Sequence, residues 1–171
     1  MDDLKTISDR QLLRLSSEAA ASPRLRKNLN IHRVPDDPIQ RLFNAVEPGT
    51  YVRPHRHARP EGWELMLAVR GAFSIITFDE NGTVLERIDL SASGGDMAVE
   101  IPPYTWHAVV ALAPETVIFE VKLGPYRPVE DKDFAAWAPE EGEPETERFV
   151  AWYEVAKPGD RPPFPSTGKV K

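Results

Sequence analysis

The sequence predicts an all-β protein, an antiparallel sandwich or small barrel, with an N-terminal helix and an irregular, partly helical C-terminal part. Short apolar runs recur between residues 51 and 123. Turn signals such as Pro48-Gly49, Asn81-Gly82 and Pro102-Pro103 separate these runs, which is typical of short strands joined by tight connections. Leucines at helical spacing within residues 8–21 predict the helix.

Residues 1–46 are expected to form a helical extension. Ser8 with Gln11 three residues later is a capping-box pattern, and Leu12 and Leu15 continue at helical spacing. Residues 36–44 are compatible with either a helical turn or a first strand.

Residues 47–125 are expected to form the barrel, and residues 126–171 an extension that packs on it and ends in a flexible tail. Within the extension, residues 145–155 are expected to form a last helix. The barrel strands are predicted at residues 51–57, 63–69, 73–78, 83–90, 97–101, 105–112 and 116–123.

Composition narrows the possible partners and the location. The chain has 171 residues, a net charge of −6 and no cysteine, which argues against nucleic acid and anionic membranes as partners. No apolar run approaches the length of a membrane span, and the acidic N-terminus lacks the apolar region of a signal peptide. We therefore expect a cytoplasmic protein that binds a small molecule.

Three histidines and one glutamate predict a metal site. His55 and His57, two residues apart on a predicted strand, would point to one face, Glu64 lies on the next strand, and His107 follows a proline-led turn. Such ligands suit a divalent transition metal and leave coordination positions open, but they do not choose among Fe, Mn, Ni, Zn, Co and Cu. The alternatives are a solvated histidine pair and a core histidine at position 107.

The same residues resemble the motifs of the cupin superfamily. Gly49, five residues, His55-x-His57, then Glu64, six residues and Gly71 follow its first motif. Glu61 is at the commoner distance from His57 but lies in a predicted loop, so we favour Glu64. His107 follows Pro102 at the spacing of the second motif, although Tyr104 and Ala111 depart from it. The resemblance implies a cupin fold (a small β-barrel or double-stranded β-helix, jelly-roll-like) and a bound metal, but no particular reaction.

More narrowly, residues 8–142 resemble the WbuC-type cupin-fold metalloproteins. The similarity lies in residues 22–32, 37–41, 53–57, 106–107 and 120–126. Some members of that family are associated with surface-polysaccharide loci, so the resemblance implies a role in that metabolism.

Four further residues are candidates for substrate binding. Tyr51 and Arg53 would share the face of the histidines unless Pro54 introduces a bulge, and Arg53 would bind a carboxylate or phosphate or else pair with an acid at the rim. Arg26 and His32 belong to a basic segment that would grip an anionic ligand over the barrel mouth, or else be a solvated linker. Glu120 would orient a ligand histidine or be a surface acid.

Two classes of function follow. The first is a metal-dependent enzyme, an oxygenase, isomerase or lyase acting on a sugar, nucleotide-sugar or keto acid. The second is a non-catalytic protein that binds or senses a sugar or another small molecule through the metal. A third, weaker interpretation is a metal-free, sugar-modifying barrel with His107 as base. An edge strand has unpaired backbone groups that another element must cover. The N-terminal helix of the same chain or of a partner chain would cover them, and we favour a homodimer.

Overall fold

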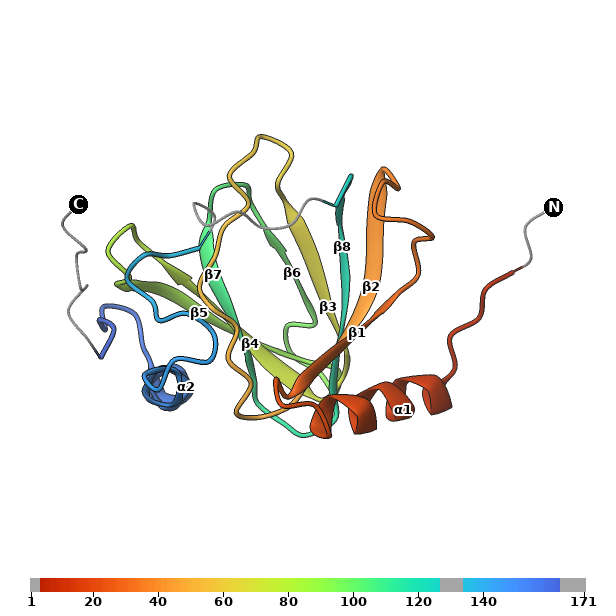
Figure 1. Cartoon of the computed structure of the whole chain (residues 1–171), viewed down its shortest axis with the longest axis horizontal. Coiled ribbons are helices and arrows are strands. Elements are labelled where there is room, and N and C mark those ends of the chain that lie inside the picture. The colour runs from red at the N-terminus through yellow and green to blue at the C-terminus, as the bar shows by residue number, and fades with distance from the viewer. Residues whose placement is uncertain (1–3, 127–133, 164–171) are drawn as a thin grey trace.

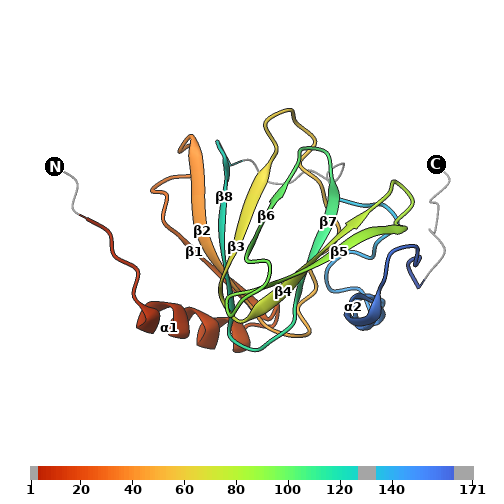
Figure 2. The same ribbon diagram turned by 180° about the vertical axis from the view of Figure 1, so that it is seen from behind.

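The computed structural model describes residues 4–126 and 134–163, and its strands form two facing antiparallel sheets (Figures 1 and 2). One sheet has five strands in the order β1-β2-β8-β3-β6, and the other has three in the order β5-β4-β7. The elements are α1 (Asp9–Ala20), β1 (Arg26–Asn30), β2 (Ile39–Val46), β3 (Glu64–Arg70), β4 (Ala72–Phe78), β5 (Val84–Ser91), β6 (Ala98–Ile101), β7 (Trp106–Ala111), β8 (Thr116–Leu123) and α2 (Thr146–Val155).

The prediction of an all-β sandwich with an N-terminal helix is confirmed. Strands β3 to β8 begin and end within one residue of their predicted positions, because turn signals bound each of these short apolar runs. The core between the sheets is formed by apolar side chains of both inner faces, among them Met66, Phe73, Ile75, Val109 and Ile118.

The strand predicted at residues 51–57 is wrong. That segment runs extended between the sheets and makes only isolated bridges at His55. Pro54 has no N–H to donate, and the Pro54 carbonyl accepts a hydrogen bond from Ala135 N, so no continuous ladder forms here.

Two strands lie inside the segment 1–46, where the sequence indicated a helical extension. β1 and β2 join the five-stranded sheet, and all eight residues of β2 pair with β8. The sequence left residues 36–44 open between a helical turn and a strand. The pairing shows a strand, which spans Ile39–Val46. The division of the chain at residues 46 and 125 stays a prediction.

Each helix covers the outer face of one sheet. Ser8 and Gln11 form the predicted capping box, and Leu12, Leu15 and Ala19 of α1 pack on the five-stranded sheet. In α2, Phe149 and Tyr153 are buried against the three-stranded sheet. No helix in the described part of the chain is long and apolar enough to cross a membrane. The predicted flexible tail lies largely outside the described residues.

Candidate metal centre

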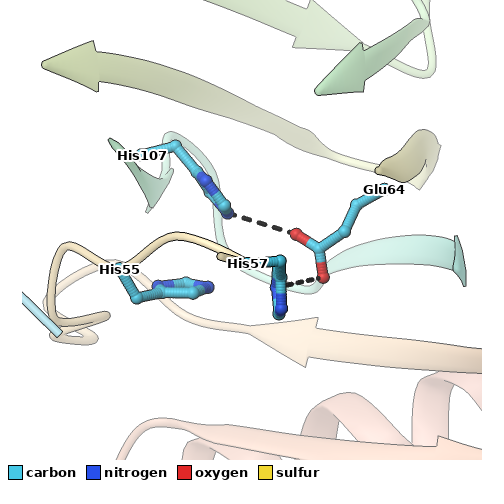
Figure 3. A group of neighbouring side chains, drawn as sticks. All are labelled: His55, His57, Glu64 and His107. Atoms are coloured by element: carbon cyan, nitrogen blue, oxygen red, sulfur yellow. Dashed lines mark ion pairs between the residues drawn. The ribbon is translucent and has the colours of Figure 1, made fainter. Parts of the chain in front are cut away.

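The four predicted metal ligands converge on one point inside the fold (Figure 3). One ligand atom each from His55, His57, Glu64 and His107 lies within 4.8 Å of all the others. Glu64 is the first residue of β3 and His107 the second of β7, so the group joins the two sheets at one end of the sandwich.

Backbone contacts hold the histidine segment in place without a regular strand. His55 N donates to His107 O at 3.0 Å, and His107 N donates to His55 O at 2.9 Å, so these two residues are paired directly. The carbonyl of His57 accepts from Arg59 N and Tyr104 N. A side chain at Gly62 would place its Cβ 2.7 Å from the Cβ of His57, which explains why a glycine follows this segment.

Three buried atoms of the group have no hydrogen-bond partner among the described residues. Glu64 Oε1 lies 2.9 Å from His57 Nε2, and Glu64 Oε2 lies 3.2 Å from His107 Nε2. Nevertheless His57 Nε2, His107 Nε2 and Glu64 Oε2 form no hydrogen bond although all three atoms are buried. Buried polar atoms are rarely left unpaired, and a shared cation would satisfy all three together. The donor set therefore fits a divalent transition metal.

Two of the histidines are held in the tautomer that a metal requires. The Nδ1 atoms of His55 and His107 each lie 2.9 Å from a backbone carbonyl oxygen, that of Arg53 and that of Thr105 respectively. A carbonyl only accepts, so in the neutral ring Nδ1 carries the proton and Nε2 keeps a lone pair for the metal.

Electrostatics support the same protonation states. Burial, together with the neighbouring His107, lowers the pKa of His55 to about 3, so this imidazole is neutral. Burial alone would raise the pKa of Glu64, but the Lys122 ammonium beside it holds the pKa well below the usual range. Glu64 is therefore an ionised carboxylate.

A buried polar network behind Glu64 was not anticipated. Lys122 Nζ lies 2.8 Å from Glu64 Oε1 and 2.7 Å from Glu120 Oε1, and Asn44 Nδ2 donates to Glu120 Oε2 at 2.6 Å. The described contacts of Glu120 include no histidine, and its side chain is buried, so neither predicted role of Glu120 is what the structure shows. Strand pairing explains the network, because Lys122 lies opposite Glu64 in the register of β8 and β3.

A cavity of about 220 Å³ lies beside the metal group. His55 and Glu64 form one end of it, and Lys122, Glu120 and Asn44 form a polar wall on the five-stranded sheet. The apolar lining is contributed by Ala45, Val46, Val52, Met66, Val109 and Ile118. The remaining lining residues are Arg24, Arg26, Lys27 and Asn28 at the β1 side.

Of the four predicted substrate-binding residues, Arg26 lines this cavity and the other three do not. Arg26 pairs with Glu141 and donates to the carbonyl of Tyr51. Tyr51 is buried beneath α2 and donates to Pro139 O, while Arg53 donates to Ala135 O. His32 is buried with its Nδ1 against the backbone of Arg41. The substrate roles of these residues stay predictions.

Comparison with known proteins finds a match to a family profile over part of the chain and several similar folds. A family profile described as "Domain of unknown function (DUF6016)" matches residues 7–90. No curated protein matches the chain.

Among solved structures, KdgF from Halomonas sp. is 25% identical, with 62% of this chain and 84% of that chain covered and a TM-score of 0.47. A cupin superfamily protein from Desulfitobacterium hafniense is 19% identical, with 71% and 98% covered and a TM-score of 0.49. Bacillus subtilis oxalate decarboxylase is 18% identical, with 77% and 33% covered and a TM-score of 0.48. These are likenesses of fold. The chain itself is a β-sandwich of two antiparallel sheets, and it carries a histidine–glutamate group that could hold a metal ion.

Proposed function

We propose that this chain is a metal-dependent cupin that acts on a small polar or anionic molecule. The metal would be held by His55, His57, Glu64 and His107. The observation that supports this most is that one ligand atom from each of the four residues lies within 4.8 Å of the others. Three atoms of these residues, His57 Nε2, His107 Nε2 and Glu64 Oε2, are also buried without a hydrogen-bond partner in the described part of the chain. A bound divalent metal would supply Lewis-acid chemistry at a position open to the cavity.

The residues around the metal group have separable tasks. His55 and His107 present their Nε2 lone pairs, while Lys122 holds one oxygen of Glu64 and leaves Oε2 for the metal. The apolar lining limits the water that reaches a bound molecule. An oxygenase, isomerase or lyase working on a sugar, nucleotide-sugar or keto acid would use such a site.

Binding or sensing without turnover is the second candidate function. The charged side chains on the polar wall are paired with one another, and Arg24 and Arg26 pair with Glu141. None of these groups is a ready-made acid or base for catalysis. Membership of the WbuC-type proteins, a place in surface-polysaccharide metabolism and a cytoplasmic location are further proposals, which rest on the sequence resemblance and composition.

Metal analysis of the full chain tests this function. We expect chain purified without added metal to contain a divalent transition metal, or to take up about one per chain on reconstitution, since the site offers four ligands. With free metal at 100 times its Kd, the free energy of unfolding should exceed that of chelated protein by about 2.7 kcal/mol. A chain that takes up no metal contradicts the proposal. Co-purified small molecules, identified by mass spectrometry and then assayed for turnover, would separate an enzyme from a binding protein.

We also propose a homodimer through the outer face of the five-stranded sheet. Strand register aligns Arg41, Val121, Leu65 and Glu100 in one row across β2, β8, β3 and β6. A twofold axis parallel to the strands, placed between β8 and β3, would bring a second copy face to face with the first. The order of the row would then be reversed in the second copy. Arg41 of each copy would then face Glu100 of the other, and Leu65 would face Val121. The row is self-complementary in charge, and Leu65 at its centre is 37% exposed.

Replacing Leu65 with lysine is expected to convert the dimer to a monomer, because the substitution buries an ammonium at the centre of the contact. Sedimentation of the full chain at increasing concentration measures this. The matched control is Leu85→Lys, which changes an exposed leucine on β5 of the other sheet and should leave the dimer intact. A native chain that stays monomeric at high concentration contradicts the proposed interface.

A further inference from the structure

The polar wall of the cavity contains a buried carboxylate with an unsatisfied oxygen. Glu120 is 6% exposed and lines the cavity, and its Oε2 accepts from Asn44. Its Oε1 lies 2.7 Å from the Lys122 ammonium but meets no hydrogen-bond geometry in the described structure. Burying a carboxylate is costly, so its presence in the lining of the cavity indicates a role other than packing.

Sheet register shows why this carboxylate faces the cavity. On β8, Glu120 alternates with outward-facing residues and shares its face with Ile118 and Lys122. Across the sheet, Lys122 pairs with Glu64 and Glu120 with Met66. One ammonium thus lies between the proposed metal ligand and a second carboxylate, so a molecule bound at the metal also reaches Glu120.

We propose that Glu120, supported by Asn44, accepts a hydrogen bond from a hydroxyl group of the molecule that the metal holds. The ligand is then a small hydroxylated compound that places a hydroxyl group, and no second carboxylate, at Glu120. This inference rests on the proposed metal-dependent function and narrows its substrate class.

Charge sets the limit on the anion. On the wall itself one ammonium faces two carboxylates, Glu64 and Glu120, and the proposed divalent cation would be held beside Glu64. Arg24, Arg26 and Lys27 line the β1 side of the cavity, so the limit on negative charge applies at Glu120 and not to the cavity as a whole. A second carboxylate on the same small molecule would be forced against Glu120, and like charges placed together at a buried site strongly oppose binding. A hydroxyl at that position instead donates to Glu120 Oε1.

Size and lining complete the description. A cavity of about 220 Å³ is smaller than the pockets that enclose drug-sized ligands, and it corresponds to the liquid volume of about seven water molecules. A compound of three to six carbons fits inside it. Val52, Met66 and Val109 would contact the carbon skeleton on the side away from the hydroxyls.

Three small acids test the inference by calorimetric titration into metal-loaded full chain, once its metal content is measured. Lactate and glycerate both offer a 2-hydroxy acid to the metal, and glycerate adds one hydroxyl that the metal does not need. Malonate is of similar size but carries two carboxylates. We expect glycerate to bind more tightly than lactate by about threefold or more, and more tightly than malonate by about tenfold or more.

Glu120→Gln should change this selectivity in a direction that structural damage would not produce. Because the amide is neutral, malonate should bind about tenfold more tightly than it binds the native chain, and the gap between glycerate and lactate should narrow. Glu86→Gln is the matched control, since it makes the same change on an exposed residue of β5 and should preserve the native order.

The possible outcomes separate a failure of the proposed metal-dependent function from a failure of this inference alone. A chain that holds no metal overturns both the proposed function and this inference. A chain that holds metal but binds none of the three acids, or binds malonate as tightly as glycerate, overturns the inference alone. If Glu120→Gln does not fold, the order of the three acids on the native chain still decides.

Discussion

Replacing His107 with alanine is expected to abolish stable metal retention. His107 is buried, its Nε2 faces Glu64 Oε2 at 3.2 Å, and its Nδ1 lies against the Thr105 carbonyl. Loss of a residue that only orients a ligand costs 10–100-fold in metal affinity, so we expect loss of this nitrogen itself to cost more than about 100-fold. Competition of the full chain with a chelator of known affinity measures the change.

His32→Asn is the matched control for this experiment. His32 is the one histidine of the chain outside the candidate metal group, and it is also buried. Its ring contacts the backbone of Arg41 and does not line the cavity. Metal affinity should therefore stay at the native value in this variant, whatever happens to its stability. Native affinity in a folded His107→Ala variant would exclude His107 as a ligand and contradict the proposed site.

Local patterns were sufficient to predict most elements of this fold. The capping box at Ser8 and the Asn81-Gly82 turn depend on a few neighbouring residues, and the strands from β3 to β8 follow short apolar runs between turn signals. β1 was missed because its five residues, Arg26–Asn30, include one apolar side chain, and pairing with β2 stabilises it as a strand. The segment at 51–57 failed for the opposite reason: its alternation resembles a strand, but Pro54 interrupts the ladder.

The candidate metal group was easier to predict than its surroundings. Histidine and glutamate at characteristic spacings leave a signal in the sequence, and these four side chains converge. The Lys122–Glu120–Asn44 network has no such signal, because it depends on the register of three strands that are distant in sequence. Parity along β8 and the register with β3 together would have indicated that Glu120 and Lys122 face the same interior as Glu64.

Replacing Lys122 with methionine is expected to destabilise the metal-free chain by about 3–5 kcal/mol, the usual cost of removing one partner from a buried ionic network. The Lys122 ammonium is the described cation in contact with both Glu64 and Glu120, and both carboxylates are buried. Without it, two negative charges would face one another in the interior. Urea unfolding of the full chain in the presence of a chelator measures the loss.

The same variant should lose less stability when metal is bound. A divalent cation held by Glu64 would supply positive charge where the ammonium was removed, so metal should stabilise Lys122→Met more than it stabilises the native chain. The double variant Lys122→Met/Glu120→Gln removes one of the opposed carboxylates as well and should recover part of the stability, which gives a second measurement if the single variant does not fold. An equal loss with and without metal would show that Lys122 and the metal do not act on the same carboxylate. A loss below about 1 kcal/mol without metal would show that the network does not contribute to the fold.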